Sequence, residues 1–122
     1  MAQFKKGFTL IELLIVVLII GILAAILVQR FGNSKDKTYV SQMQSDLRNL
    51  ATYEEQYAAE NGGTYFSGTA TMTSPLRGFH PSESVRITVT TVAGPPPSWT
   101  ASASHALTPR TCVIVTGLVS CG

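Results

Sequence analysis

The sequence predicts an α+β fold, with one long N-terminal α-helix and a small C-terminal antiparallel β-sheet packed on the second half of that helix. Three patterns predict it. Residues 8–28 form an almost uninterrupted apolar run, and residues 40–57 place apolar side chains at helical spacing on one face. From residue 85 onward, apolar and polar side chains alternate in short segments, as in β-strands. With 122 residues, the chain is expected to form one domain with a modest core.

The apolar run begins at Phe8 and lasts to Val28, and Glu12 is its only charged residue. About 20 residues at ~1.5 Å rise each span roughly 30 Å, which is the thickness of the hydrocarbon core of a bilayer. A carboxylate in such a helix costs ~2.5–3.5 kcal/mol or more, so it is tolerated mainly where it has a partner or a function. Because no residue between Leu13 and Val28 can pair with Glu12, we expect its partner on another molecule or at a chain terminus.

Beyond the apolar run, the helix is expected to continue to about Gly62. The apolar and aromatic side chains of its second half recur every three or four residues, at Val40, Met43, Leu47, Leu50 and Tyr57. Glu54 lies in the same stripe, and Asp46 is expected on the opposite face. Asn61, Gly62 and Gly63 predict the helix end, because glycine adopts the left-handed backbone conformation of a helix C-cap.

The C-terminal part of the chain predicts three or four antiparallel strands. Residues 64–84 are rich in Gly, Ser, Thr and Pro and are expected to connect the helix to the sheet. Residues 85–92 and 99–106 alternate between apolar or small and polar side chains, and a proline-rich loop separates them. A turn is expected at residues 107–110, and residues 111–119 predict a third, mostly apolar strand.

The sequence favours no enzyme activity, cofactor or metal site. His80 and His105 stand alone, without a carboxylate or cysteine at ligand spacing, and no serine lies in a nucleophile-elbow sequence. After Glu60 the only acidic residue is Glu83, which is too few for a calcium site with six to eight oxygen ligands. The formal net charge of +2 argues against a strongly steered nucleic-acid binder.

A resemblance to the class III signal sequence of type IV prepilins is carried by residues 5–13, KKGFTLIEL. In that family a prepilin peptidase cuts after the glycine and methylates the new N-terminal phenylalanine. The resemblance implies cleavage between Gly7 and Phe8, methylation of Phe8, and pairing of Glu12 with the Phe8 amine of a neighbouring subunit. The motif is specific, because a basic leader, a small residue, an aromatic residue and a glutamate rarely coincide at this spacing.

The resemblance also divides the chain into three segments. Residues 1–7 are expected to be the leader peptide, residues 8–31 the hydrophobic helix for membrane anchoring and polymerisation, and residues 32–122 the globular domain. Lysines in the leader favour a cytoplasmic N-terminus. An ordinary secretory signal cut near Ala24 and Ala25 is the alternative, but the apolar run is longer than the usual hydrophobic region of such a signal.

The two cysteines, Cys112 and Cys121, predict a disulfide if the domain is exported, whereas a cytosolic protein would keep two free thiols. Such a bridge requires the chain to double back after Val115. Closing a short loop in this way contributes ~2–3 kcal/mol in the chain-entropy account. We therefore expect the bridge to matter for the stability of a domain with a small core.

The resemblance implies a structural subunit of a type IV pilus, or fimbrium. The prepilin is expected in the inner membrane, and the processed subunit in a helical homo-oligomeric filament at the cell surface, built by the pilus assembly machinery and supporting motility, adhesion or DNA uptake. The main alternative is a pseudopilin or minor pilin of a type II secretion or DNA-uptake machine. The scarcity of acidic residues after Glu60 weakens it, because the major pseudopilins carry an acidic calcium-binding loop. A membrane-anchored binding domain that never assembles is a third possibility.

Overall fold

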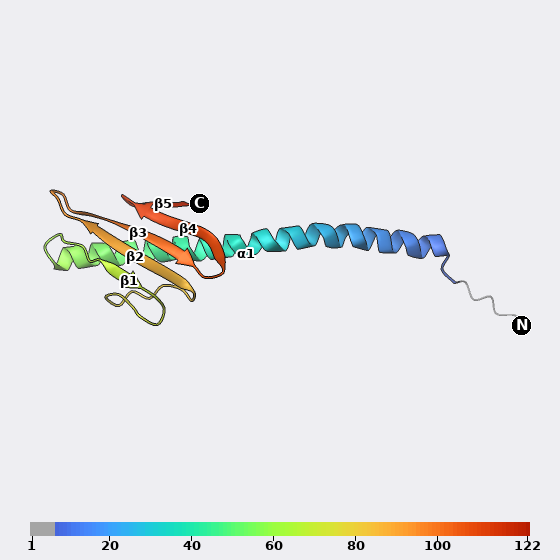
Figure 1. The fold of residues 1–122 in the computed structure, drawn as a ribbon, viewed down its shortest axis with the longest axis horizontal. Coiled ribbons are helices and arrows are strands. Elements are labelled where there is room, and N and C mark those ends of the chain that lie inside the picture. The colour runs from blue at the N-terminus through green and yellow to red at the C-terminus, as the bar shows by residue number, and fades with distance from the viewer. Residues whose placement is uncertain (1–6) are drawn as a thin grey trace, which may run out of the picture. The chain divides into compact units, whose positions relative to one another are not determined.

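A computed structural model of the chain describes residues 7–122, with only the backbone for residues 29–33. Within this range it contains one helix and five strands (Figure 1). Their bounds are α1 Leu10–Glu60, β1 Gly68–Ala70, β2 Val85–Val92, β3 Ser98–His105, β4 Thr108–Val115 and β5 Leu118–Cys121. The predicted α+β fold is confirmed. The chain divides into two compact units, Met1–Lys35 and Asp36–Gly122.

The described part of the first unit is helical from Leu10 onward, and its described side chains are exposed. Within the described chain, the one segment long and apolar enough to cross a membrane is Leu10–Val28, with a mean hydropathy of 3.2. Large side chains on every side of this segment, such as Leu13, Ile19 and Leu27, keep half or more of their surface exposed. A continuous apolar surface of this kind indicates that lipid or other helices cover it.

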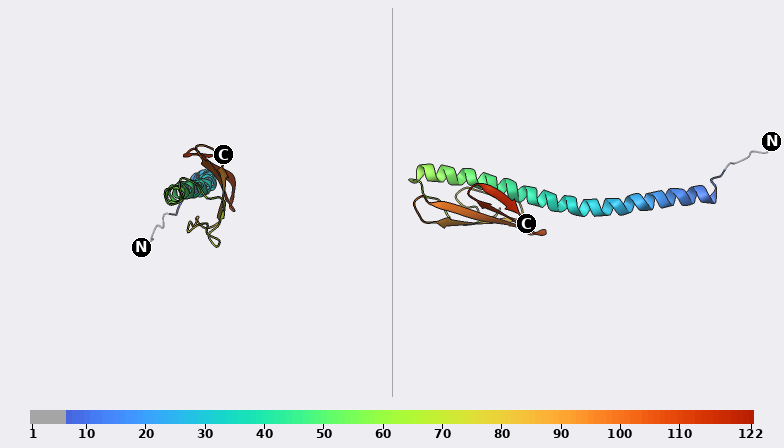
Figure 2. Two further views of the ribbon diagram at one scale, coloured as in Figure 1. Left: turned by 90° about the vertical axis from the view of Figure 1, so that its left-hand side faces the viewer. Right: turned by 90° about the horizontal axis from the view of Figure 1, so that it is seen from above.

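In the second unit, a five-stranded antiparallel sheet packs along one side of α1 (Figure 2). The strands follow one another in the order β1-β2-β3-β4-β5, so each strand pairs with the one that precedes it in the chain. The expectation that the sheet packs on the second half of the helix is confirmed.

The hydrophobic core lies between α1 and the inner face of the sheet. The helix contributes the predicted stripe, in which Val40, Met43, Leu47 and Leu50 are buried. The strands contribute every second residue to the same cluster, namely Val85, Ile87, Val89, Ala101, Ala103, Cys112 and Ile114. The alternation that predicted the strands therefore also predicted which face of the sheet is buried.

Two strands differ from the prediction. The connection expected over residues 64–84 contains β1, which pairs with β2. The strand expected over residues 111–119 is divided into β4 and β5 by a turn at Thr116 and Gly117, both of which have positive φ angles of 50° and 82°. Two consecutive residues with positive φ are typical of a tight hairpin turn. The residue pattern did not place this turn, because Thr116 is an unusual residue at such a position; only the predicted disulfide required the chain to double back after Val115.

The turn expected at residues 107–110 lies earlier than predicted. β3 ends at His105 and β4 begins at Thr108, so Pro109 is the second residue of a strand. Proline lacks an amide hydrogen and is tolerated in strands mainly near irregular pairing. The register between β3 and β4 shifts at Ser104 and His105, beside Pro109, which explains how the strand accommodates it.

Candidate functional site

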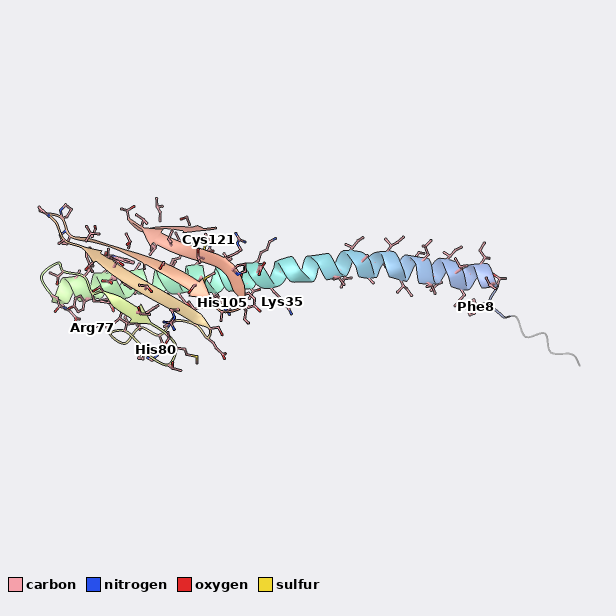
Figure 3. The ribbon with its side chains drawn as sticks, viewed as in Figure 1. Phe8, Lys35, Arg77, His80, His105 and Cys121 are labelled. Atoms are coloured by element: carbon pink, nitrogen blue, oxygen red, sulfur yellow. A yellow bond between two sulfur atoms is a disulfide. The ribbon has the colours of Figure 1, made fainter. Side chains whose placement is uncertain are left out.

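The candidate site lies at the start of α1, where Gly7, Phe8 and Thr9 precede the first helical residue. The side chain of Phe8 is 91% exposed (Figure 3). A Cβ atom added to Gly7 would meet no atom within 4 Å, so packing within the described chain does not require a glycine there. A small residue at this position is therefore better explained by something outside the fold.

Thr9 and Glu12 form a reciprocal capping pair at this helix start. The Thr9 amide donates to Oε2 of Glu12 at 2.9 Å, and the Glu12 amide donates to Oγ1 of Thr9 at 3.3 Å. This arrangement is a capping box, which gives partners to two amide groups at the helix start. Glu12 was expected to find its partner on another molecule or at a chain terminus; the structure adds Thr9 of its own chain as a hydrogen-bond partner, and a partner for the charge stays a prediction. The Thr-x-x-Glu signature of Thr9 and Glu12 in the sequence is the signal that predicts this capping box.

The capping pair engages only part of the Glu12 carboxylate. No hydrogen bond to Oε1 of Glu12 is seen within residues 7–122. A shallow groove of about 490 Å³ runs beside this carboxylate, lined by Phe8, Glu12, Leu13, Ile15 and Val16. One carboxylate oxygen is thus held by its own helix, and the other can accept a hydrogen bond from another molecule.

Cys112 and Cys121 lie opposite each other on β4 and β5 and are joined by a disulfide, with their Cα atoms 4.1 Å apart. The chain doubles back after Val115, as the predicted bridge requires. Nε2 of Gln44 on α1 donates to Sγ of Cys121 at 3.4 Å. The disulfide therefore closes the last hairpin, and the hydrogen bond connects that hairpin to the helix.

Two carboxylates of α1 are buried, and only one of them was placed in the core stripe from the sequence. Asp46, which was expected on the opposite face, is 4% exposed and accepts hydrogen bonds from the amide and Oγ of Ser82 at 2.9 and 3.0 Å. Burial raises the pKa of Asp46, and the two bonds from Ser82 oppose that rise. The expectation for Asp46 is wrong because its partner lies 36 residues away, where sequence spacing gives no signal.

Glu54 is fully buried in the stripe, and its Oε2 accepts a hydrogen bond from the Phe66 amide at 3.1 Å. Its Oε1 has no hydrogen-bond partner. Burial raises the pKa of Glu54 to about 7; the Phe66 bond lowers it, and the neighbouring Glu55 charge raises it.

The two histidines have different surroundings. His80 is exposed, whereas His105 is buried and stacks on Tyr39 with 4.3 Å between ring centroids. Nδ1 of His105 accepts from the Leu107 amide at 3.1 Å, so Nε2 carries the proton and donates to Oε1 of Gln42 at 3.2 Å. Both ring nitrogens of His105 are therefore engaged in hydrogen bonds within the fold.

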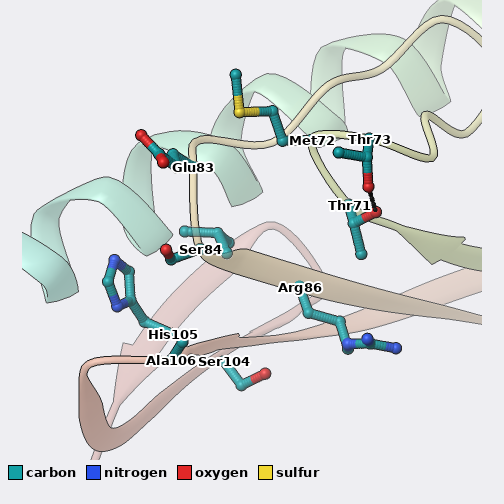
Figure 4. Close-up of a pocket in the computed structure, with 10 residues that line it drawn as sticks. Thr71, Met72, Thr73, Glu83, Ser84, Arg86, Ser104, His105 and Ala106 are labelled. Atoms are coloured by element: carbon teal, nitrogen blue, oxygen red, sulfur yellow. Dashed lines mark hydrogen bonds between the residues drawn. The ribbon is translucent and has the colours of Figure 1, made fainter.

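A cavity of about 430 Å³ lies between the loop after β1 and the ends of β2 and β3 (Figure 4). Its lining includes the hydroxyl groups of Thr71 and Ser104 and the charged side chains of Glu83 and Arg86. No group of three or more His, Cys, Asp or Glu side chains that could hold a metal ion occurs among the residues described. The lining also includes Ser84 and the ring of His105, whose two nitrogens are hydrogen-bonded to Gln42 and to the Leu107 amide.

Comparisons with known proteins agree with the features at the helix start. The family model "Prokaryotic N-terminal methylation motif" matches residues 3–28. The type IV major fimbrial protein FimA of Dichelobacter nodosus is 48% identical over 52 residues, which are 43% of this chain and 33% of FimA. A fimbrial protein of Pseudomonas aeruginosa is 43% identical over 65 residues, covering 53% of this chain and 42% of that protein.

The type II secretion system core protein G of Pseudomonas aeruginosa is 37% identical over 57 residues, covering 47% of this chain and 40% of that protein. No solved structure matches the chain. The chain spans about a third of the length of the first fimbrial relatives it matches. The methylation motif, the similarity to fimbrial and pilin proteins over about half of the chain, and the helix-plus-sheet fold together support a type IV pilin.

Proposed function

We propose that this chain is the structural subunit of a type IV pilus, most simply a major pilin. The prepilin is held in the inner membrane by residues 8–31, and prepilin peptidase removes the leader, residues 1–7, by cutting between Gly7 and Phe8. The observation that carries the proposal is the apolar segment Leu10–Val28, which is exposed on all sides and has Glu12, a member of the helix-capping pair, in its first turn. Packing against identical helices in a filament core removes this surface from water and lipid.

Cleavage changes the charge at the helix start. Before cleavage the nitrogen of Phe8 is an uncharged amide, and after cleavage it is a positively charged amine. That amine meets Glu12 of a neighbouring subunit when the assembly machinery adds a subunit at the filament base. A charge pair in surroundings of low dielectric constant is strong and directional, so it fixes the axial register while the apolar side chains supply the packing.

The capping box makes Glu12 suited to this task. Thr9 holds Oε2, so Oε1 can accept the neighbouring amine without the helix losing its cap. The carboxylate is therefore oriented before the neighbour arrives, which lowers the entropy lost on docking. A membrane anchor alone would explain the apolar segment, but it would not explain why Oε1 of a glutamate in that segment is left available to another molecule.

The second candidate is a pseudopilin or minor pilin, favoured by the 37% identity to a type II secretion core protein G. The two candidates share processing and membrane insertion, and they differ in whether filaments leave the cell envelope. We favour the surface filament because two fimbrial proteins match at higher identity, 48% and 43%. The same proposal holds that the chain is a structural protein and not an enzyme. The filament would support adhesion, motility or DNA uptake.

Intact-mass measurement of filaments sheared from the cell surface tests the proposal. We expect a dominant species that begins at Phe8, carries one added methyl group and lacks two hydrogens because of the disulfide. Processed protein found only in the envelope would instead indicate the pseudopilin. Protein that keeps its leader in the envelope would indicate a static membrane anchor.

A further inference from the structure

The connection between α1 and β2, residues 61–84, is held against the helix at two points by buried carboxylates. Glu54 accepts the amide of Phe66 near the start of the connection, and Asp46 accepts the amide and hydroxyl of Ser82 near its end. Both carboxylates come from α1, and both donors come from the connection. These two points therefore decide how firmly the connection lies on the helix.

The two points differ in how completely the carboxylate is bonded. Each oxygen of Asp46 accepts one hydrogen bond from Ser82, at 2.9 and 3.0 Å. Glu54 accepts one hydrogen bond at 3.1 Å, and its Oε1 is buried without a partner. A buried charge is costly unless hydrogen bonds compensate it, so ionisation is supported at Asp46 and opposed at Glu54.

The groups near Glu54 supply no compensating cation among the residues described. On α1 its neighbours are Glu55, which is acidic and exposed, and Tyr57. From the connection, the ring of Phe66 meets Tyr57 edge to face at 5.3 Å, and the guanidinium of Arg77 lies 5.2 Å from the centre of the Tyr57 ring. The arginine therefore contacts the aromatic ring, and no ion pair with Glu54 is present in the described chain.

The sheet adds no charge beside Glu54 either. Its inner face is built from apolar side chains, Arg86 lies on the exposed face, and the buried His105 is bound to Gln42 and to the Leu107 amide. Glu83 in the connection is exposed. An ionised Glu54 can thus lower its free energy chiefly by reaching water, which requires the segment around Phe66 to move.

We propose that the start of the connection, residues 61–67, detaches from α1 when Glu54 ionises, while the Ser82 end stays bound to Asp46. Gly62 and Gly63 allow this movement, since both have positive φ and open space around the position of a Cβ. Detachment uncovers the aromatic side chains of Phe66 and Tyr57. The domain therefore presents an aromatic surface above a threshold pH and covers it below that threshold.

The direction follows from linkage between protonation and conformation. We call the state closed when residues 61–67 lie on α1 and open when they are detached. Burial raises the pKa of Glu54 from 4.5 to about 7 in the closed state, whereas a water-exposed Glu54 in the open state has its ordinary value. The closed state is favoured fully below the ordinary value and loses this advantage as the pH rises through about 7. Between these two values the opening equilibrium should rise about tenfold per pH unit, and above them it should level off.

Amide hydrogen exchange by NMR on the full chain in dodecyl maltoside micelles tests the proposal between pH 5 and pH 8. After correction for the intrinsic exchange rate at each pH, we expect protection of the Phe66 amide to fall about tenfold per pH unit up to neutral pH. The Ser82 amide should keep its protection over the same range. This contrast within the wild-type chain depends on no variant folding correctly.

Two substitutions complete the test. Glu54→Gln keeps an oxygen acceptor for Phe66 but cannot ionise, so Phe66 protection should become independent of pH. Glu60→Gln removes an exposed carboxylate at the end of the same helix and should leave the pH dependence unchanged. Constant protection of Phe66 in the wild type, a parallel fall at Phe66 and Ser82, or an unchanged slope in Glu54→Gln would each overturn the proposal.

Discussion

The two halves of helix α1 carry similar apolar side chains in opposite surroundings. In residues 10–28 these side chains face every direction and remain exposed, whereas in residues 40–50 they share one face and are buried beneath the sheet. The first half therefore depends on other molecules for its burial, and the second half is completed by its own chain. One continuous helix thus contains a segment that its own chain leaves exposed and a segment that completes the core, and the pattern of apolar residues distinguishes the two.

The glutamates of the two halves show the same difference. Glu12 is exposed; its Oε2 accepts a hydrogen bond from the Thr9 amide, and its Oε1 is available to another molecule. Glu54 is fully buried, with one oxygen that has no partner. The first can gain a partner from another subunit, and the second can gain one only if its own fold opens.

The largest expected effect comes from removing the charge at the first glutamate. Glu12→Leu should abolish surface filaments while leaving the protein in the membrane, because the apolar helix remains and the register-fixing pair is lost. Electron microscopy of sheared filaments and fractionation of the membrane measure both properties. Normal piliation by this variant in cells without the wild-type copy would show that Glu12 does not direct assembly.

Shortening an apolar side chain should change the stability of the second unit when the residue lies in the second half of α1, and should leave it unchanged when the residue lies in the first half. Leu50→Ala removes a fully buried side chain and should destabilise the second unit by about 2–5 kcal/mol. Ile19→Ala is the matched control, since Ile19 is exposed and should leave that stability unchanged. Urea unfolding in micelles, followed by fluorescence of the single Trp99, reports on the second unit. An equal loss of unfolding free energy in both variants would contradict the difference between the two halves of α1.

Removing the disulfide should weaken the second unit alone. The double variant Cys112→Ala and Cys121→Ala should lose about 2–3 kcal/mol, because the unfolded chain regains the freedom of the closed loop. The same unfolding measurement applies, with reduced wild-type protein as the control that keeps both side chains. Unchanged unfolding in both samples would mean that hairpin pairing alone sets the stability of β4 and β5.

The stability of the second unit should also depend on pH through Glu54. Its folded-state pKa of about 7 lies above the ordinary value of 4.5, so the fold is stabilised at low pH and loses that stabilisation as the pH rises through about 7. Glu54→Gln should flatten the dependence of the melting temperature on pH between 5 and 8. A wild-type melting temperature that rises over this interval would contradict the sign.

The smallest expected effect concerns the helix cap. Thr9→Val removes the hydroxyl acceptor for the Glu12 amide and should cost about 0.5–2 kcal/mol of local helix stability. Thr9→Ser keeps the hydroxyl and should behave as the wild type. Amide exchange of Glu12 in micelles distinguishes the two variants. Equal exchange rates would show that the cap does not hold the helix start.

Much of the fold could be predicted because its signals are periodic. The spacing of Met43, Leu47 and Leu50 identified the buried helix face, and the alternation in residues 85–92 gave the bounds and inner face of β2. The turn at Thr116 and Gly117 lacked a common hairpin signature, so the residue pattern did not separate β5 from β4, and only the expected disulfide required a turn there. Periodicity reports on local structure and gives no information about an unusual turn.

The site was predictable to a different extent. The motif around Glu12 indicated the helix start, and the bond from Thr9 to Glu12 follows from the Thr-x-x-Glu spacing, which lies on the N-terminal side of Glu12. The bonds from Asp46 to Ser82 and from Glu54 to Phe66 join different elements. Such contacts depend on how the connection returns over the helix, which a single sequence does not specify.

The strand order of the sheet has a consequence for how the domain is made. Each strand pairs with its predecessor, so every pairing partner has already been synthesised when a strand appears. The helix on which the sheet lies also precedes all of the strands. A chain that emerges gradually can therefore fold progressively, because after the longer connection between β1 and β2 each later strand closes only a short loop.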